Sequence, residues 1–151
     1  KTMSSLKTLV LKFEDVTNEQ ILEELNKLNN KIKIWIKKGF EVGSHSMNHY
    51  NLNNLTNNQK KYQILKPKQF FKREYGVNIE SFSYPFGSYN ADCLNILKNK
   101  YKFAVTTKRS RYVKGKFNRL EIPRVPVNSN TSIFKYFLKI STFYEDIKFK
   151  I

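Results

Sequence analysis

The stretch of sequence that decides the fold is residues 39–52, which read GFEVGSHSMNHYNL. Gly39 is placed to end a helix, and we interpret residues 40–43 as a short buried strand. His45 and His49 follow this strand, four residues apart, and they are the only histidines of the chain. Two imidazoles at this spacing can face a common point, as a divalent metal requires. Taken alone, such a pair is more often a structural feature of a loop.

Strands and helices are expected to alternate on both sides of this stretch. The alternation predicts a single α/β domain over residues 1–151 with a largely parallel sheet. In such sheets, functional residues gather in the loops that follow the carboxyl ends of the strands, which is where both histidines fall. We expect further strands at residues 6–13, 81–84, 102–106 and 120–127.

The helices are predicted from apolar residues at helical spacing and from capping residues at their starts. Residues 31–36 fit a helix or a strand equally well, because their isoleucines alternate and also extend a helical stripe. The expected helices run from Thr17 or Asn18 to Leu28, from Thr56 to about Tyr75 with an interruption near Pro67, from Asn90 to about Lys100, and from Thr131 or Ser132 to Ile140.

The composition is that of a folded but strongly basic domain. The chain has 28 Lys and Arg against 12 Asp and Glu, a formal charge of +16, and 40% hydrophobic residues. Such a charge attracts polyanions of any kind, but no nucleic-acid-reading motif accompanies it, so we expect no nucleic-acid partner. Cys93, the single cysteine, reads as a small core residue, and no stretch is long and apolar enough to span a membrane.

Two further segments carry candidate functional residues. Residues 81–90, SFSYPFGSYN, read as a strand that leaves through a tight turn at Pro85 and Gly87, with Asn90 opening the next helix. Such a turn exposes backbone N–H groups and presents aromatic side chains. Residues 121–127, EIPRVPV, read as a strand, and Ser129 to Ser132 then lead into a helix.

These segments, in this order, resemble the motifs of the polysaccharide deacetylases of carbohydrate esterase family 4. Gly-Ser-His-x-x-x-His-x-x-Leu at residues 43–52 resembles the family's second motif, and residues 82–90 resemble its third. Residues 103–107, FAVTT, and the Pro-Arg-Val strand with its Thr-Ser-capped helix are also similar to family members. The resemblance runs, with gaps, from about residue 36 to 140.

The resemblance implies a role for each of these segments. His45 and His49 are expected to ligate a metal, usually zinc, and Tyr84, Pro85 and Phe86 to form one wall of the substrate groove. The backbone N–H of Phe86 is expected to help hold the oxyanion. The family usually has Arg where this chain has Ser83. Arg124 is therefore a candidate for the missing cation, and an exposed strand arginine is the alternative.

The N-terminal motif departs from the family pattern. The family strand ends Thr-Phe-Asp-Asp-Gly, whereas residues 12–16 here read KFEDV. The match implies Glu14 as the general base and Asp15 as the third metal ligand. However, only 30 positions separate Asp15 from His45, which leaves out one βα unit. The alternative is that the true motif lies upstream of Lys1. The family's late Leu-x-His motif is absent as well.

The resemblance implies a partial or distorted (β/α) barrel-like fold and a metal-dependent hydrolase. Its reaction would remove N-acetyl or O-acetyl groups from an acetylated polysaccharide or oligosaccharide, in the cell envelope or outside the cytoplasm. Two other interpretations remain open. One is a catalytically inactive, deacetylase-like carbohydrate-binding domain. The other is a basic binder of nucleic acid or membrane surfaces whose motifs are coincidental.

Overall fold

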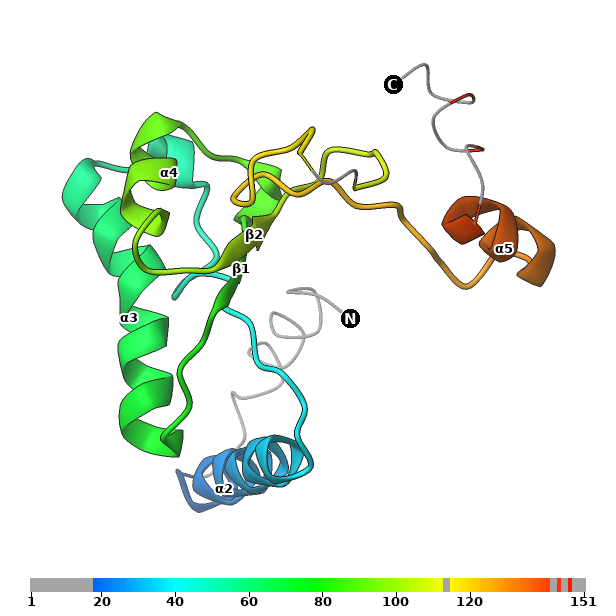
Figure 1. Ribbon diagram of the computed structural model, residues 1–151. Coiled ribbons are helices and arrows are strands. Elements are labelled where there is room, and N and C mark those ends of the chain that lie inside the picture. The colour runs from blue at the N-terminus through cyan, green and yellow to red at the C-terminus, as the bar shows by residue number, and fades with distance from the viewer. Residues whose placement is uncertain (1–17, 113–114, 142–143, 145–146, 148–151) are drawn as a thin grey trace. The chain divides into compact units, whose positions relative to one another are not determined.

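The computed structural model describes residues 18–112, 115–141, 144 and 147, and its contacts divide the chain into two units, residues 1–41 and 42–151 (Figure 1). In the first unit, helix α2 covers Asn18–Lys37. Residues 31–36 are therefore helical. Gly39, with φ of 81°, follows the helix end as expected, and its N–H donates to the Ile36 carbonyl at 3.0 Å. The expected strand at residues 6–13 lies outside the described residues.

The second unit is organised around parallel strand pairing. Strands β1 (Ser81–Ser83) and β2 (Phe103–Val105) pair in parallel, with Phe82 opposite Ala104. Single parallel bridges extend this sheet on both sides, from Ser44 to Phe82 and from Ile122 to Val105. Four chain segments thus run in the same direction, in agreement with the predicted parallel α/β arrangement.

Two of the expected strands are reduced to these single bridges. Residues 40–43 are not a strand, and pairing with β1 begins only at Ser44, whose N–H donates to the Ser81 carbonyl at 2.9 Å. At residues 120–127, Ile122 exchanges hydrogen bonds with β2, but Pro123 and Pro126 follow. Because proline has no N–H to donate, the ladder cannot continue past them in regular form.

The helices start close to where the sequence predicts. Thr56 and Gln59 form a reciprocal capping box, Asn90 caps the next helix through the Cys93 N–H, and Ser132 accepts from the Lys135 N–H. The interruption expected near Pro67 is wrong: the helix continues through this buried proline. The helices of this unit are α3 (Asn57–Tyr75), α4 (Ala91–Leu97) and α5 (Ile133–Ser141), with 3-10 turns η2 (Leu52–Asn54) and η3 (Pro85–Gly87).

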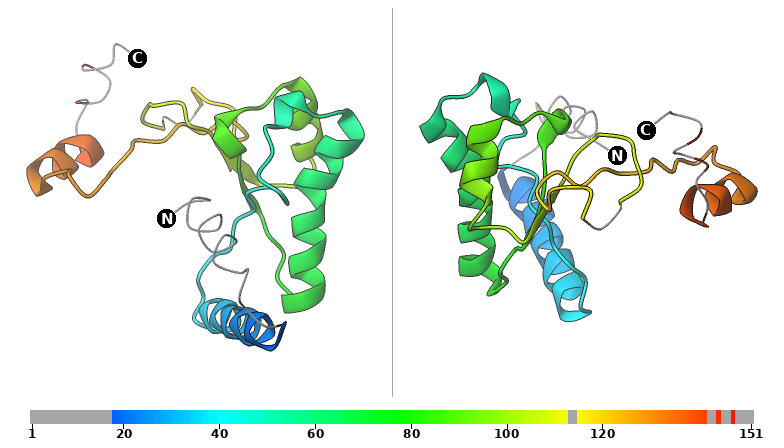
Figure 2. Two further views of the ribbon diagram at one scale, coloured as in Figure 1. Left: turned by 180° about the vertical axis from the view of Figure 1, so that it is seen from behind. Right: turned by 45° about the horizontal axis from the view of Figure 1, so that its top comes forward.

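The core lies between the sheet and helices α3 and α4, which pack against each other (Figures 1 and 2). α4 ends at Leu97, earlier than expected, because the N–H groups of Lys100 and Tyr101 both turn back to its carbonyl. None of the described helices is both long and apolar enough to cross a membrane. The buried hydrophobic residues are Leu52, Ile64, Ile79, Phe82, Tyr84, Cys93, Leu97, Tyr101, Ala104 and Leu120.

Candidate functional site

His45 is oriented by the backbone of the neighbouring strand. It follows Ser44, at the carboxyl end of the first parallel segment, and its Nδ1 lies 2.8 Å from the Ser83 carbonyl oxygen. A carbonyl oxygen only accepts hydrogen bonds, so Nδ1 must carry the proton, and Nε2 keeps its lone pair. An imidazole that donates one N–H to a backbone carbonyl and keeps the other nitrogen free is the usual form of a metal-ligating histidine.

His49 lies beside His45 and has an unpartnered nitrogen. The two ring centroids are 4.7 Å apart, with the planes at 70°. The Nδ1 of His49 is buried, and in the described part of the chain it has no hydrogen-bond partner. Such an orphaned polar atom costs about 1–3 kcal/mol. A close pair of imidazoles, one with a free Nε2 and one with an unsatisfied nitrogen, has the donor chemistry that zinc prefers.

Gln63, on the buried side of α3, holds the loop that carries both histidines. Its Oε1 accepts from the Met47 N–H at 3.1 Å and from the Asn48 N–H at 2.8 Å. Its Nε2 donates to Asn48 Oδ1 at 2.8 Å, and the residue is only 4% exposed. Sequence analysis did not identify this residue. The available signal was a polar side chain directly before Ile64, on the face of the helix that enters the core.

The turn at Phe86 completes the site from the end of β1. Its two 3-10 hydrogen bonds use the N–H groups of Gly87 and Ser88, which donate to Tyr84 and Pro85, each at 3.0 Å. The Phe86 N–H is not part of this pattern, as is usual for the first donors of a helix. The Phe86 ring is 63% exposed and meets His49 edge-on at 4.7 Å. The turn therefore brings an exposed aromatic residue to His49.

Backbone strain is concentrated in these two loops. Among the described residues, the non-glycine residues with positive φ are Ser46, His49 and Phe86, at 64°, 56° and 58°. The Ser46 hydroxyl supports the strained loop by accepting from the His49 N–H at 3.0 Å. Each such conformation costs of order 1–3 kcal/mol, and strain of this kind clusters at functional sites. The strain thus marks the same place as the histidine pair.

Two residues of the predicted substrate wall belong to the core instead. Tyr84 is 1% exposed, donates from its hydroxyl to the Leu120 carbonyl at 2.9 Å, and stacks on Tyr89 at 4.5 Å. Pro85 is also buried. This corrects the expectation that the side chains of Tyr84 and Pro85 line a groove. Phe82 and Tyr84, two positions apart, both point into the core, because alternate residues of a strand share one face.

The side chain of Arg124 contacts the residue that follows the carboxyl end of β2. Its Nε donates to the Thr106 carbonyl at 2.7 Å, and the residue is exposed. Part of the guanidinium is therefore used to fix this segment to β2. At the position of the missing family arginine, it is the Ser83 backbone that contacts His45. The role of Arg124 as a compensating cation stays a prediction.

Glu121, in the same segment as Arg124, has a carboxylate that already has two side-chain partners. The Tyr89 hydroxyl donates to Glu121 Oε1 at 2.7 Å, and Lys108 Nζ lies 3.7 Å from the same oxygen. Burial, above all, raises the pKa of Tyr89, so its hydroxyl stays protonated and able to donate. Glu121 thus belongs to a local network with Tyr89 and Lys108.

The predicted base and third ligand, Glu14 and Asp15, lie outside the described residues. Within the described ranges, no group of three or more His, Cys, Asp or Glu side chains is arranged to hold a metal ion. The structure therefore brings together His45, His49 and the Phe86 turn.

Known proteins were compared with the chain by sequence and by structure. The sequence model of the polysaccharide deacetylase family matches residues 16–103. YxkH of Bacillus subtilis, whose name assigns it to the polysaccharide deacetylases, is 31% identical over 78 residues, or 51% of this chain and 28% of that protein.

Solved structures of deacetylases are also similar to this chain. The polysaccharide deacetylase BC0361 of Bacillus cereus has a TM-score of 0.68 at 26% identity, over 75% of this chain and 36% of that one. The deacetylase PplD of Streptococcus pyogenes, solved with acetate, has a TM-score of 0.69 at 21% identity, over 75% of this chain and 50% of that one.

These likenesses confirm the predicted fold, of which the chain contains a part. It spans 28% of its curated relative and 50% or less of the two solved structures. The described portion supplies helices and a small parallel sheet of a barrel-like polysaccharide deacetylase fold. Because the family match covers more than half of the 151 residues, the chain belongs to the polysaccharide deacetylase family.

Proposed function

We propose that this chain contributes to a metal-dependent hydrolase that removes N-acetyl or O-acetyl groups from an acetylated polysaccharide or oligosaccharide. In this proposal, His45 and His49 are two ligands of zinc or another divalent metal. The observation that carries it is the pairing of the two rings at 4.7 Å, with Nδ1 of His45 fixed on the Ser83 carbonyl. When bound, the metal would polarise the acetyl carbonyl and make a water molecule more acidic.

The protein's own groups would position the substrate around this pair. The Phe86 N–H, a backbone donor of the residue whose ring meets His49, is the candidate to stabilise the negative charge that develops on the acetyl oxygen. The exposed Phe86 ring offers an apolar face to a sugar ring. Gln63 keeps the histidine loop in place through its two bonds to backbone N–H groups. Glu14 is the candidate base and Asp15 the candidate third ligand.

Acetate release from N-acetylglucosamine oligomers tests the proposal. We expect turnover with added zinc that is lost in His49→Ala and retained in Met47→Leu, a volume-conserving change in the same loop. We also expect Glu14→Gln to lower turnover by about two to four orders of magnitude if Glu14 is the base, since positioned proton transfer contributes that much. Turnover that persists in His49→Ala would overturn the assignment of the histidines.

A second candidate function is a carbohydrate-binding domain without catalysis. It is favoured by one observation: residues 12–16 read KFEDV, so glutamate replaces the family's aspartate base and valine its glycine. In that case, zinc and acetylated oligosaccharides would bind, and no acetate would be released from any acetylated sugar. Equilibrium binding of chitin oligomers, measured beside acetate release on the same preparation, separates the two candidates.

A further inference from the structure

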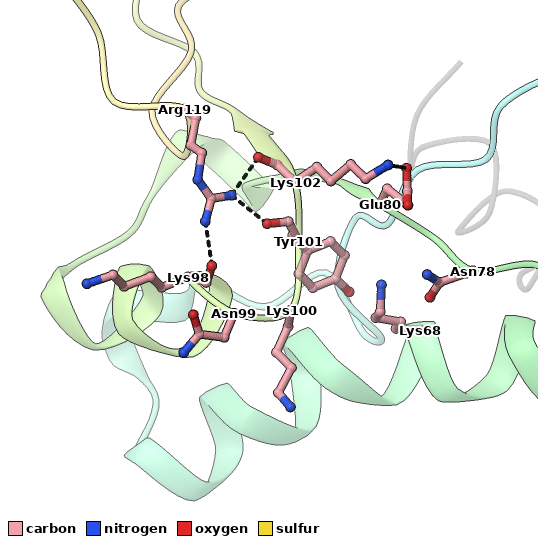
Figure 3. A pocket seen from close by; sticks show the side chains of 9 residues that line it. All are labelled: Lys68, Asn78, Glu80, Lys98, Asn99, Lys100, Tyr101, Lys102 and Arg119. Carbon is pink, nitrogen blue, oxygen red and sulfur yellow. Dashed lines mark hydrogen bonds and ion pairs between the residues drawn. The ribbon is translucent and has the colours of Figure 1, made fainter.

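A basic pocket lies at the amino-terminal ends of strands β1 and β2. It is an open cavity of about 480 Å³ (Figure 3). Most of the residues that line it lie just before β1 or β2, with Lys68 from α3 and Arg119 from the segment before Ile122. The histidine loop and the Phe86 turn instead follow the carboxyl ends of the parallel segments. The two places are therefore at opposite edges of the sheet. The lining residues are Lys68, Asn78, Glu80, Lys98, Asn99, Lys100, Tyr101, Lys102 and Arg119.

The charges that line this pocket do not balance. Five of the nine residues are cationic and one, Glu80, is acidic. Glu80 forms an ion pair with Lys102 at 2.6 Å. Across the described ranges, no carboxylate lies within ion-pair distance of the other four cations, Lys68, Lys98, Lys100 and Arg119. Cations that line one pocket repel one another, and an anion bound there would relieve that repulsion.

Arg119 fixes the shape of the pocket. One terminal nitrogen of its guanidinium donates to the carbonyls of Tyr101 and Lys102, at 2.7 and 2.6 Å. The other donates to the carbonyl of Lys98, just beyond the end of α4 (Figure 3). These bonds tie the segment that carries Lys98, Lys100 and Lys102 into one conformation. The backbone of this segment is thereby fixed before any ligand arrives, so that only the lysine side chains need to be ordered on binding.

Lys68 is the most buried of the cations that line the pocket. Its ammonium donates to the Ile79 carbonyl and lies 5.1 Å from the centroid of the Tyr101 ring. Burial lowers the pKa of Lys68, and three neighbouring lysines add to this lowering against the opposing effect of Glu80. The ammonium is thus partly desolvated, with other lysines close enough to affect it. A negatively charged ligand would interact more strongly with it here than with a fully solvated lysine.

We propose that this pocket binds a ligand that carries several phosphate groups. Ammonium groups bind phosphate oxygens through charge-assisted hydrogen bonds, and they need no fixed bidentate geometry to do so. The amides of Asn78 and Asn99 add neutral donors on two sides of the pocket (Figure 3). The cavity is larger than one phosphate group requires, and its cations are spread along it, so a ligand with linked phosphates fits best. A free oligophosphate and phosphates along a polymer share this chemistry.

Calorimetric titration of the whole chain with tripolyphosphate tests the pocket. We expect saturable binding at one site. The double variant Lys98→Gln, Lys100→Gln should weaken it at least about tenfold, because it removes two charged donors to phosphate oxygens. Both lysine side chains are exposed, and the bond from Arg119 to Lys98 uses the backbone carbonyl, which the substitution keeps, so the fold should be unaffected. Equal melting temperatures of the variant and the original chain would verify this.

The matched control removes two positive charges elsewhere. Lys61 and Lys116 are exposed and do not line the pocket, so Lys61→Gln, Lys116→Gln should bind tripolyphosphate like the original chain. Equal weakening in both double variants would show attraction by the net charge alone and overturn the proposal. Binding of orthophosphate as tight as that of tripolyphosphate would also overturn it. If an oligomer of glycerol phosphate binds more tightly than tripolyphosphate, the phosphate groups recognised by the pocket belong to a polymer. If tripolyphosphate binds more tightly, the ligand is a free oligophosphate.

Discussion

The two edges of the small parallel sheet are built by different physical means. At the carboxyl edge, Ser46, His49 and Phe86 hold left-handed backbone conformations, and a buried ring nitrogen has no partner among the described residues. At the amino edge, none of the nine described residues that line the basic pocket has a positive φ, and the excess is one of positive charge. Strain fixes atoms in exact positions, as metal ligation needs, whereas accumulated charge attracts an anion without demanding one geometry.

The largest expected effect comes from removing one of the two proposed metal ligands at the carboxyl edge of the sheet. His45→Ala should weaken zinc binding more than about 100-fold, since even the loss of an outer hydrogen-bonding partner of a metal ligand costs about 10–100-fold. Zinc titration by calorimetry measures this, with Lys98→Gln, Lys100→Gln as the control from the opposite edge. Unchanged zinc affinity in His45→Ala would remove the histidine pair from consideration as a metal site.

The same titration decides the role of Asp15. If this carboxylate is the third ligand, Asp15→Asn should weaken zinc binding by a similar factor, because a neutral amide replaces an anionic ligand. Zinc binding unchanged by this substitution would leave the site with two known ligands. The third would then have to come from another carboxylate.

An effect on stability is expected where the Phe86 turn approaches Thr107, just beyond β2. Gly87 has a φ of 67°, and a Cβ placed there would lie 1.9 Å from the Thr107 hydroxyl oxygen. Gly87→Ala should therefore lower the free energy of unfolding by roughly 2–5 kcal/mol, from the left-handed backbone and from overpacking together. Denaturant unfolding measures this loss.

Gly76 supplies the matched control for the turn. Its φ is 70°, but a Cβ there meets nothing within 4 Å. Gly76→Ala should thus lose only the conformational part, about 1–2 kcal/mol. If the two variants were equally stable, the close contact between the Phe86 turn and Thr107 would not restrict residue 87.

The sequence predicted those features that depend on neighbours in the chain. The histidine spacing, the Pro85–Gly87 turn and the caps at Thr56 and Asn90 are local, and the structure has each of them. Contacts between distant segments could not be predicted. Gln63 reaches Asn48 across 15 residues, and Arg119 reaches the carbonyl of Lys98 across 21.

Local patterns also misled where the rest of the fold decides the outcome. Tyr84 looked like an exposed aromatic because it adjoins a turn, but strand alternation places it beside Phe82 in the core. Pro67 looked like a helix break. It is buried within α3, where packing outweighs the loss of one backbone hydrogen bond.

The smallest expected effect separates positioning of the histidine loop from ligation within it. Gln63→Leu removes the acceptor of the Met47 and Asn48 N–H groups, so zinc affinity should fall about tenfold, as for an outer partner of a ligand. Gln63→Glu keeps an oxygen for both N–H groups and loses only the donor to Asn48 Oδ1, so it should recover most of the affinity. Recovery by glutamate with unchanged 1:1 stoichiometry is the outcome that a positioning role requires. If Gln63→Leu and Gln63→Glu reduced the zinc affinity equally, Gln63 would act through its packing in the core. The histidine loop would then be held by its own strained backbone and by the Ser46 hydroxyl.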